Sequence, residues 1–330
     1  MASEIAVGVD FGGTKVLASV VDLKTGKILG SAKKRTDQND SPKELGERLF
    51  GTIDEALKSA SLAKRQHISG IGVGIAGQVD SKHGVLLGAP NLSQATVNLP
   101  LAEMLRKRYE VPATLLNDVQ IAAIGESEFG AGQESDDFLC VFVGTGVGGA
   151  FVRNRELVRG ASGSAGEIGH LVIDANGRLC GCGGRGHLEA YASRTAITQA
   201  IIGELKRGRK SILLELVPGL RNDPFGGGAL RSGILARAID EDDELCVDAI
   251  RDAAYYLGLG LASAINLLNP PTIILGGGVI ESVPMLFDLA SHHAHQEALA
   301  TPGKAVEVVR AKLGDNAGVV GAAIVGARAA

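Results

Sequence analysis

The segment FLCVFVGTGVGGAFVRNRELVRG, residues 138–160, consists of an apolar run, a Gly-Thr-Gly turn, a second apolar run and a polar turn. The same order occurs near the N-terminus in EIAVGVDFGGTKVLASVVDLKTGKILG, residues 4–30, where a third apolar run follows. Apolar runs separated by glycine turns are typical of antiparallel hairpins and meanders. Two such segments in one chain predict a duplicated unit.

Helical and strand-like patterns alternate along the rest of the chain. We expect helices over 42–65, 100–108, 118 onward, 239–268 and about 315–330, and strands over 71–77, 84–87 and 113–117. Residues 272–282 fit a further strand that ends in glycines at a helix start. This alternation is typical of α/β domains, and 330 residues can form two of them. The sequence predicts a smaller lobe over 1–118, with the C-terminal helix packed back on it, and a larger lobe over 119–314.

The charge and hydropathy of the chain exclude several classes of protein. The net charge is −4, and no run of Lys and Arg follows one predicted face, so we expect no nucleic-acid partner. No apolar run approaches the roughly 20 residues that span a bilayer, and no secretory signal precedes the first strand pattern. We therefore expect a cytoplasmic protein without membrane contact.

Both glycine turns are candidates for binding phosphate. DFGGTK, residues 10–15, lies between two strand patterns, whereas a GxxxxGK[ST] phosphate loop lies between a strand and a helix. The backbone N–H groups of this turn could still bind an anion, with Asp10 holding a magnesium ion. A tight hairpin is the alternative, but a second turn at 144–146 favours two sites for successive phosphates of a nucleotide.

A carboxylate stands where a predicted strand changes to a helix, in LLND, residues 115–118. Asp is a favoured N-cap residue, so Asp118 could simply cap the helix. The carboxyl end of a strand is also a common position for a general base. The neighbouring Asn117 could hydrogen-bond a polyol.

The segment AGEIGHLVIDANGRLCGCGGRGHLE, residues 165–189, combines metal-binding and carboxylate side chains. Its two imidazoles and two thiols match a closed tetrahedral zinc site. The donors are His170, Cys180, Cys182 and His187. A redox role is less favoured, because the spacing is not Cys-x-x-Cys. Such a zinc site does not need Glu167 and Glu189, which could bind sugar hydroxyls.

Several of these motifs occur together in one known family. DFGGTK, GIAGQVD, APN, LLND, FVGTGVGGA, GEIGH, the CGCG segment with its LE, and LGGGV stand in the order and spacing of the ROK family of sugar kinases and repressors. The chain most resembles a bacterial glucokinase of this family over essentially its whole length. The resemblance implies a two-lobed actin-like ATPase fold, related to ribonuclease H, with duplicated mixed-sheet domains and a central cleft.

The resemblance also implies roles for individual residues. Asp118 matches the catalytic base that takes the proton from the sugar 6-hydroxyl. The residues that match the hexose-binding groups are Asn91, Asn117, Asp118, Glu167, His170 and Glu189. The residues that match the nucleotide-binding positions are Asp10, Gly12, Gly13, Thr14, Lys15, Gly144, Thr145, Gly146, Gly276, Gly277 and Gly278.

Two positions depart from the family pattern. The usual zinc motif has three cysteines and one histidine, and here His187 stands in place of the third cysteine. Histidine is a normal zinc ligand, so we expect a structural zinc site that carries one negative charge fewer. After the APN turn, family glucokinases often have an aromatic residue, whereas this chain has Ser93 and Gln94. That difference leaves the preferred sugar open.

The expected activity is phosphorylation of a hexose by ATP with Mg²⁺, most simply glucose to glucose 6-phosphate. Other acceptors remain open, namely N-acetylmannosamine, N-acetylglucosamine, mannose or fructose, and polyphosphate is an alternative donor. A sugar-responsive repressor is less favoured, because repressors of the family carry an N-terminal winged helix and DFGGTK here begins at residue 10. The resemblance favours a homodimer.

Overall fold

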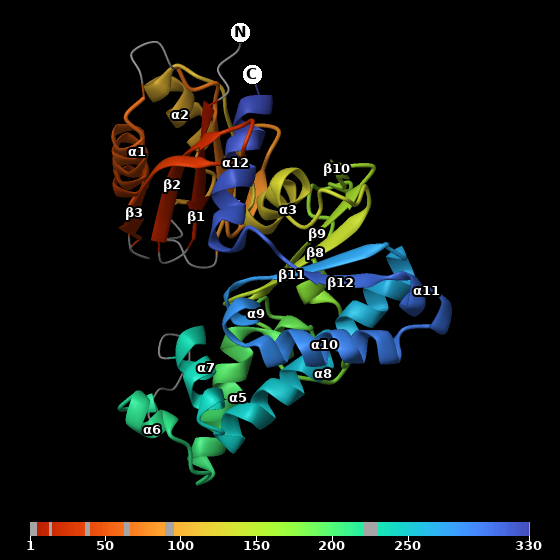
Figure 1. Cartoon of the computed structure of the whole chain (residues 1–330). Helices are drawn as coiled ribbons and strands as arrows, with labels where there is room; N and C mark the ends of the chain where they lie inside the picture. Colours follow the sequence, from red (N-terminus) through yellow and green to blue (C-terminus); the bar gives the residue numbers. More distant parts are fainter. Residues whose placement is uncertain are drawn as a thin grey trace. The chain divides into compact units, whose positions relative to one another are not determined.

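The computed structural model describes residues 5–12, 15–36, 40–62, 67–89, 96–220 and 230–329. The chain divides into two compact units (Figure 1). The first unit contains Met1–Asp136, Phe151–Ala165 and Asp315–Ala330. The second contains Asp137–Ala150 and Gly166–Gly314.

The first unit is built on a mixed sheet of five strands. Its main strands are β1 (Ile5–Phe11), β2 (Lys15–Asp22), β3 (Ile28–Arg35), β4 (Ile71–Ile75) and β7 (Ala113–Asn117). They lie in the order β3-β2-β1-β4-β7. The pairs β1–β2 and β2–β3 are antiparallel, whereas β1–β4 and β4–β7 are parallel. A separate small hairpin pairs β5 (Gln78–Asp80) with β6 (Val85–Gly88).

Helices cover both faces of this sheet. On one face, α1 (Pro42–Ser59) and α2 (Leu101–Tyr109) share a core with alternate strand residues such as Val7 and Val9. On the other face lie α3 (Asp118–Phe129) and α12 (Ala317–Arg328), which pack together (Figure 1). Glycines make this approach possible, because a Cβ atom at Gly8 would lie 1.7 Å from the carbonyl oxygen of Val319.

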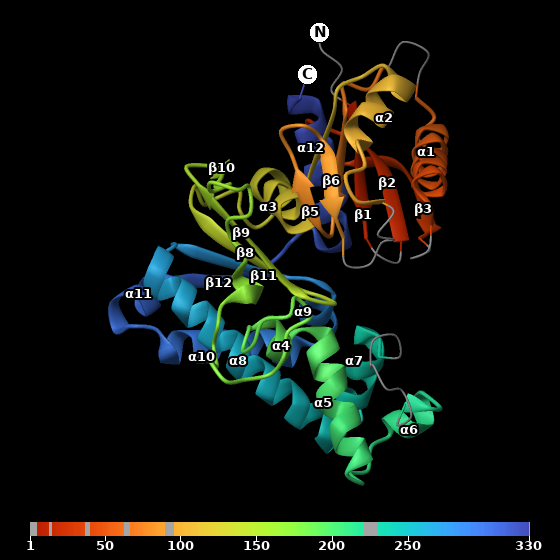
Figure 2. The ribbon, with the colours of Figure 1, turned by 180° about the vertical axis from the view of Figure 1, so that it is seen from behind.

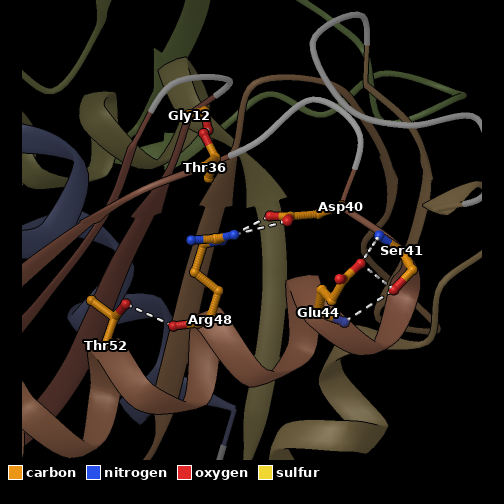
Figure 3. A network of polar contacts seen from close by, with 7 residues as sticks. All are labelled: Gly12, Thr36, Asp40, Ser41, Glu44, Arg48 and Thr52. Carbon is orange, nitrogen blue, oxygen red and sulfur yellow. Dashed lines mark hydrogen bonds and ion pairs between the residues drawn. The ribbon is translucent and has the colours of Figure 1, made fainter.

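Polar contacts fix the start of α1 (Figure 3). Ser41 and Glu44 form a capping box, in which each side chain accepts from the other's backbone N–H. Arg48 donates to both carboxylate oxygens of Asp40, over 2.7 and 2.8 Å. Thr36 donates to the carbonyl oxygen of Gly12, which ties the end of β3 to the first glycine turn.

A second sheet has the same strand order and lies mostly in the second unit. Its strands are β8 (Phe138–Val143), β9 (Val147–Arg153), β11 (Thr272–Gly276) and β12 (Glu307–Arg310), and β10 (Glu156–Leu157) pairs with the end of β9. Strand β10 and the end of β9 fall within Phe151–Ala165, which belongs to the first unit. The order is β10-β9-β8-β11-β12, with β8, β11 and β12 parallel. This repeats β3-β2-β1-β4-β7 and confirms the predicted duplication.

Helices make up most of the second unit (Figure 2). They are η2 (Ile168–His170), α4 (Glu189–Ala192), α5 (Arg194–Lys206), α6 (Leu213–Leu216), α7 (Ser232–Asp240), α8 (Glu244–Leu268), α9 (Gly278–Ser282), α10 (Pro284–Glu297) and α11 (Ala300–Ala305). A 3-10 turn, η4 (Gly314–Asn316), precedes α12. The long α8 packs against α10, α5 and α4.

Two sequence-based expectations differ from the observed structure. The helix expected over 239–268 ends at Leu268 as expected but begins later, because α7 ends at Asp240 and α8 begins after Asp243, which accepts from the backbone N–H of Cys246 as its N-cap. The lobe boundary expected after residue 118 differs from the observed division, because α3 packs against α12 and stays with the first unit. Helix α12 itself packs on β1 and β4, as expected.

Candidate functional site

Two carboxylates stand at strand ends on the same sheet of the first unit. Asp10 lies near the end of β1, and Asp118 directly follows β7, with β4 between these strands. The pKa of Asp10 is raised to about 6, first by burial and then by the charges of Asp118 and Asp315, against the opposing charge of Lys15. Carboxylate oxygens whose negative charges lie close together suit a hard divalent cation such as Mg²⁺.

Asn117 is the N-cap of α3, and Asp118 is its first helical residue. The Asn117 side-chain oxygen accepts from the backbone N–H groups of Val119 and Gln120. The N-cap position considered for Asp118 is therefore held by its neighbour, while one Asp118 carboxylate oxygen also accepts from the backbone N–H of Val119 over 2.9 Å. Because the Asn117 side-chain oxygen already accepts two hydrogen bonds, a polyol would be bound by the side-chain nitrogen of Asn117. That nitrogen donates to the carbonyl oxygen of Gly77 over 3.5 Å.

The first glycine turn is only partly described. The backbone N–H of Gly12 donates to the carbonyl oxygen of Lys15, which closes the turn between β1 and β2. Gly13 and Thr14 lie outside the described residues, as do Asn91, Ser93 and Gln94 after the APN turn. A Cβ atom at Gly12 would meet only the Lys15 carbonyl oxygen, at 3.6 Å, so packing does not require glycine there.

The second glycine turn, residues 144–146, joins β8 to β9 in the second unit. The backbone N–H of Gly144 donates to the carbonyl oxygen of Gly146. Directly after the turn, the backbone N–H of Val147 donates to the Glu189 carboxylate over 3.0 Å. A Cβ atom at Gly146 would lie 2.3 Å from that carboxylate, so this glycine lets Glu189 reach the turn.

The glycine run at 276–278 ends β11 beside the second glycine turn. A Cβ atom at Gly277 would lie 2.5 Å from the carbonyl oxygen of Val143, the last residue of β8, and its φ of +95° is one that L side chains rarely adopt. Gly276 is crowded by the Phe142 ring and Ala311. Only Gly278 has open space, with Ser232 Oγ 3.8 Å from a Cβ there. The second glycine turn and the start of α9 are thus neighbours in one unit.

The four predicted zinc ligands come together in the second unit. Their ligand atoms all lie within 4.8 Å of one another, in the cluster of His170, Cys180, Cys182 and His187. An antiparallel bridge between Val172 and His187 brings the ends of the segment together. The backbone N–H of Cys180 donates to the carbonyl oxygen of Gly184, which closes the turn that carries both cysteines. His187 therefore faces the other ligands despite its departure from the family pattern.

The spacing inside this zinc-binding cluster fits one tetrahedral ion. Nδ1 of His187 lies 3.3 Å from Nδ1 of His170 and 3.2 Å from Sγ of Cys182. With ordinary Zn–N and Zn–S bond lengths, tetrahedral ligands lie about 3.3 Å (N to N) and about 3.5 Å (N to S) apart. Burial raises the pKa of the Cys180 thiol to about 11, so a bound cation must displace its proton.

Tyr191 fixes the segment independently of the zinc-binding cluster. Its hydroxyl donates to the Asp174 carboxylate and accepts from the backbone N–H of Arg178. The guanidinium of Arg178 lies 4.5 Å from the centre of the Tyr191 ring and pairs with Asp252 of α8. Because Tyr191 is buried, these contacts hold residues 174–178 against α4 and α8.

The two glutamates of the segment have different surroundings. Glu189 is the first residue of α4, and one oxygen accepts from Val147 while the other lies 3.7 Å from Cys180 Sγ. Glu189 thus links the second glycine turn to the zinc-binding cluster. Glu167 is exposed at the start of the η2 turn, three residues before His170.

Sequence reasoning missed residues that support the second glycine turn. The backbone N–H of Arg194 donates to the carbonyl oxygen of Gly144, and its guanidinium donates to Thr145 Oγ1 over 2.8 Å. Thr195 Oγ1 donates to the carbonyl oxygen of Thr145. Nothing in the sequence pairs these residues with a turn about fifty positions earlier; only their place at a helix start after Glu189 could have pointed to them.

Comparison with known proteins places the chain in a family. The sequence matches the ROK family over residues 6–328. The chain belongs to the ROK family. A ROK family glucokinase from Streptomyces griseus, solved in complex with glucose and AMPPNP, has a TM-score of 0.84 at 32% identity and covers 98% of this chain and 99% of that chain. The expected actin-like ATPase fold is thereby confirmed.

Other relatives of this ROK family chain include enzymes and a regulator. A glucokinase from Halalkalibacterium halodurans is 32% identical over 322 residues, which are 97% of this chain and 94% of that protein. The xylose repressor of Bacillus subtilis is 28% identical over 316 residues, which are 96% of this chain and 75% of the repressor. Within the described ranges, no helix is long and apolar enough to cross a membrane.

Proposed function

We propose that this protein is a hexose kinase that transfers the γ-phosphoryl group of ATP to the 6-hydroxyl of its sugar, with glucose as the first candidate. The observation that carries the proposal is the position of Asp118, a carboxylate at a strand end whose neighbour Asn117 holds the N-cap position of α3. The likeness to glucokinases over nearly the whole chain supports the same activity.

In the proposed reaction, Asp118 accepts the proton of the sugar hydroxyl while that oxygen attacks the γ-phosphorus. The new O–P bond forms as the bond to the β–γ bridging oxygen breaks, and ADP leaves with that bond's electron pair. Phosphoryl transfer depends mostly on positioning and on neutralising charge. A base aligned with the hydroxyl contributes roughly 10²- to 10⁴-fold to the rate.

The glycine turns bind the nucleotide in this proposal. Gly13 and Thr14 in the first unit and Thr145 and Gly146 in the second offer backbone N–H groups to the phosphates, with Lys15 adding a positive charge, while the N–H groups of Gly12 and Gly144 close their own turns. Gly278 and its neighbours bind near the nucleoside. Asp10 holds Mg²⁺ directly or through water, and the ion would neutralise phosphate charge when bound.

The sugar is held by groups that the zinc-binding cluster positions. Glu167 and Glu189 accept hydrogen bonds from sugar hydroxyls, and Asn91 and Asn117 offer amide groups. His170 would hold a zinc ion with Nδ1, the nitrogen that faces His187, and its Nε2 could then donate to a sugar hydroxyl. With four protein ligands the zinc would supply structure, not an activated water.

The preferred sugar and donor are best decided by direct assay. Initial rates would be measured with glucose, mannose, fructose, N-acetylglucosamine and N-acetylmannosamine, each with ATP and with polyphosphate. We expect the highest kcat/KM with glucose and ATP. Another preferred sugar would revise the substrate, and the absence of transfer to any of them would contradict the proposed function.

A repressor is the second candidate, because the Bacillus subtilis xylose repressor matches across most of this chain. The net charge of −4 disfavours it, since DNA-binding surfaces are basic. We expect no binding to duplex DNA at low salt in a mobility-shift assay, with or without sugar. We also propose a cytoplasmic homodimer, which sedimentation analysis would test.

A further inference from the structure

Arg194 is the first residue of α5, directly after its N-cap residue Ser193. Its backbone N–H donates to the carbonyl oxygen of Gly144 over 2.9 Å, and its Nη2 donates to Thr145 Oγ1 over 2.8 Å. Arg194 therefore contacts the second glycine turn both through its backbone and through its cationic guanidinium.

The guanidinium of Arg194 has no carboxylate partner among the described residues. The other contacts of α5 with the second glycine turn involve the uncharged Thr195. Burial lowers the pKa of Arg194, and no neighbouring acid offsets that effect. A guanidinium has five N–H donors, and removing it from water is costly unless an anion compensates. The guanidinium donors that Thr145 does not use thus have no anionic acceptor among the described residues.

The space beside this guanidinium is open. A Cβ atom at Gly144 would meet nothing within 4 Å, and its backbone is outside the left-handed region. By contrast, position 146 requires glycine, because a Cβ atom there would clash with the Glu189 carboxylate. Neither packing nor backbone conformation explains the glycine at 144, whereas close approach of a ligand does.

We propose that the Arg194 guanidinium binds the phosphate chain of the nucleotide donor at the second glycine turn, oriented by its hydrogen bond to Thr145. This inference rests on the proposed function, because it assigns Arg194 to the donor of that reaction. A charge-assisted hydrogen bond to phosphate is worth about 10- to 100-fold in affinity. Arg194 thereby favours nucleotides that carry phosphate over the free nucleoside.

The test compares ADP with adenosine by isothermal titration calorimetry on the full chain. Arg194→Met keeps the length and removes the charge, and Arg194→Lys keeps a charge without the planar fork. Arg209→Met is the matched control, because Arg209 pairs with Asp248 away from the second glycine turn. We expect Arg194→Met to weaken ADP binding about 10- to 100-fold while adenosine and sugar affinities stay unchanged. Arg194→Lys should be intermediate, and Arg209→Met should match the wild type.

Unchanged ADP affinity in Arg194→Met would overturn the inference. An equal fall in ADP and adenosine affinity would also overturn it, because it would mean that the side chain only braces the turn. If Arg194→Met does not fold, modification of wild-type arginines by phenylglyoxal, followed by mass spectrometry, gives a second answer. ADP, but not adenosine, should protect Arg194, and equal modification with either compound would contradict the proposal.

The two proposals fail in different ways. If the wild-type protein binds ADP but phosphorylates no hexose, the proposed function is contradicted, and the effect of Arg194→Met on ADP affinity can still be measured. A working kinase whose Arg194→Met variant binds ADP normally contradicts only the role of Arg194. A wild-type protein that binds no ADP contradicts both.

Discussion

The Nδ1 atoms of His170 and His187 lie 3.3 Å apart, in segments that are joined by the bridge between Val172 and His187. Two ring nitrogens this close compete for one proton or share a cation. Because two cysteine sulfurs complete the cluster, one zinc ion would take all four groups as ligands and would cover the exposed Cys182 thiol.

Replacing His187 should release zinc. His187→Ala leaves three ligands, and we expect its zinc affinity to fall by more than about 100-fold, whereas His187→Cys should retain one zinc per chain. Metal analysis after dialysis measures both, with His292→Ala as a histidine control outside the zinc-binding cluster. Stoichiometric zinc in His187→Ala would remove this residue from the site.

Replacing Asp118 should stop turnover without preventing substrate binding. Asp118→Asn keeps the shape of the side chain but cannot accept the proton, so we expect kcat to fall about 10²- to 10⁴-fold with little change in sugar affinity. Asp136→Asn, in the same unit but largely exposed beside Arg155, serves as the control. A wild-type rate in Asp118→Asn would show that another group is the base.

The raised pKa of Asp10 should make stability depend on pH. Its pKa is raised from 3.8 to about 6 in the folded protein, so the folded state holds the proton more tightly than the unfolded state. The contribution to stability is full below about pH 4 and is lost as pH rises to about 6, which costs up to about 3 kcal/mol. In magnesium-free buffer, Asp10→Asn should therefore be more stable than the wild type at pH 7.5, and the difference should disappear near pH 4.

Urea denaturation at several pH values measures this effect. Asp10→Asn avoids the charge at every pH, so the wild type alone should lose stability across the window. Equal free energies of unfolding for both proteins at pH 7.5 would mean that water or a neighbouring cation compensates the carboxylate in the folded state.

Glycine at position 8 should be essential for the first unit. A Cβ atom there would lie 1.7 Å from the carbonyl oxygen of Val319, so Gly8→Ala must displace α12 from the sheet. We expect a loss of more than about 3 kcal/mol, or failure to fold, by thermal or urea denaturation. Gly88→Ala is the control, because a Cβ atom there has nothing within 4 Å. Similar stability of the two variants would contradict the close packing of α12.

The repeated patterns were the parts of the structure that could be predicted from the sequence. The two glycine turns between strands predicted the duplicated sheet, since each lies between apolar runs of strand length. The zinc-binding cluster was also predictable, because its ligands are close in sequence and their chemistry is specific. Both depend on local composition, which a single sequence displays directly.

Features that depend on distant residues or on single positions could not be predicted. Asn117 and Asp118 are both good N-cap residues, and only the backbone shows which of them caps α3. The helix expected over 239–268 breaks because Asp243 starts a new helix. Asp315 raises the pKa of Asp10 from the far end of the chain, a relation that no sequence spacing reveals.

Helix α12 places the last described turns of the chain on β1, the strand that begins the fold, and on β4. During synthesis, β1 emerges from the ribosome long before this helix. The second unit, whose segments end at Gly314, has been synthesised by then. The first unit must therefore wait with only α3 on this face of its sheet until α12 has left the ribosome, and it is the later of the two to finish folding.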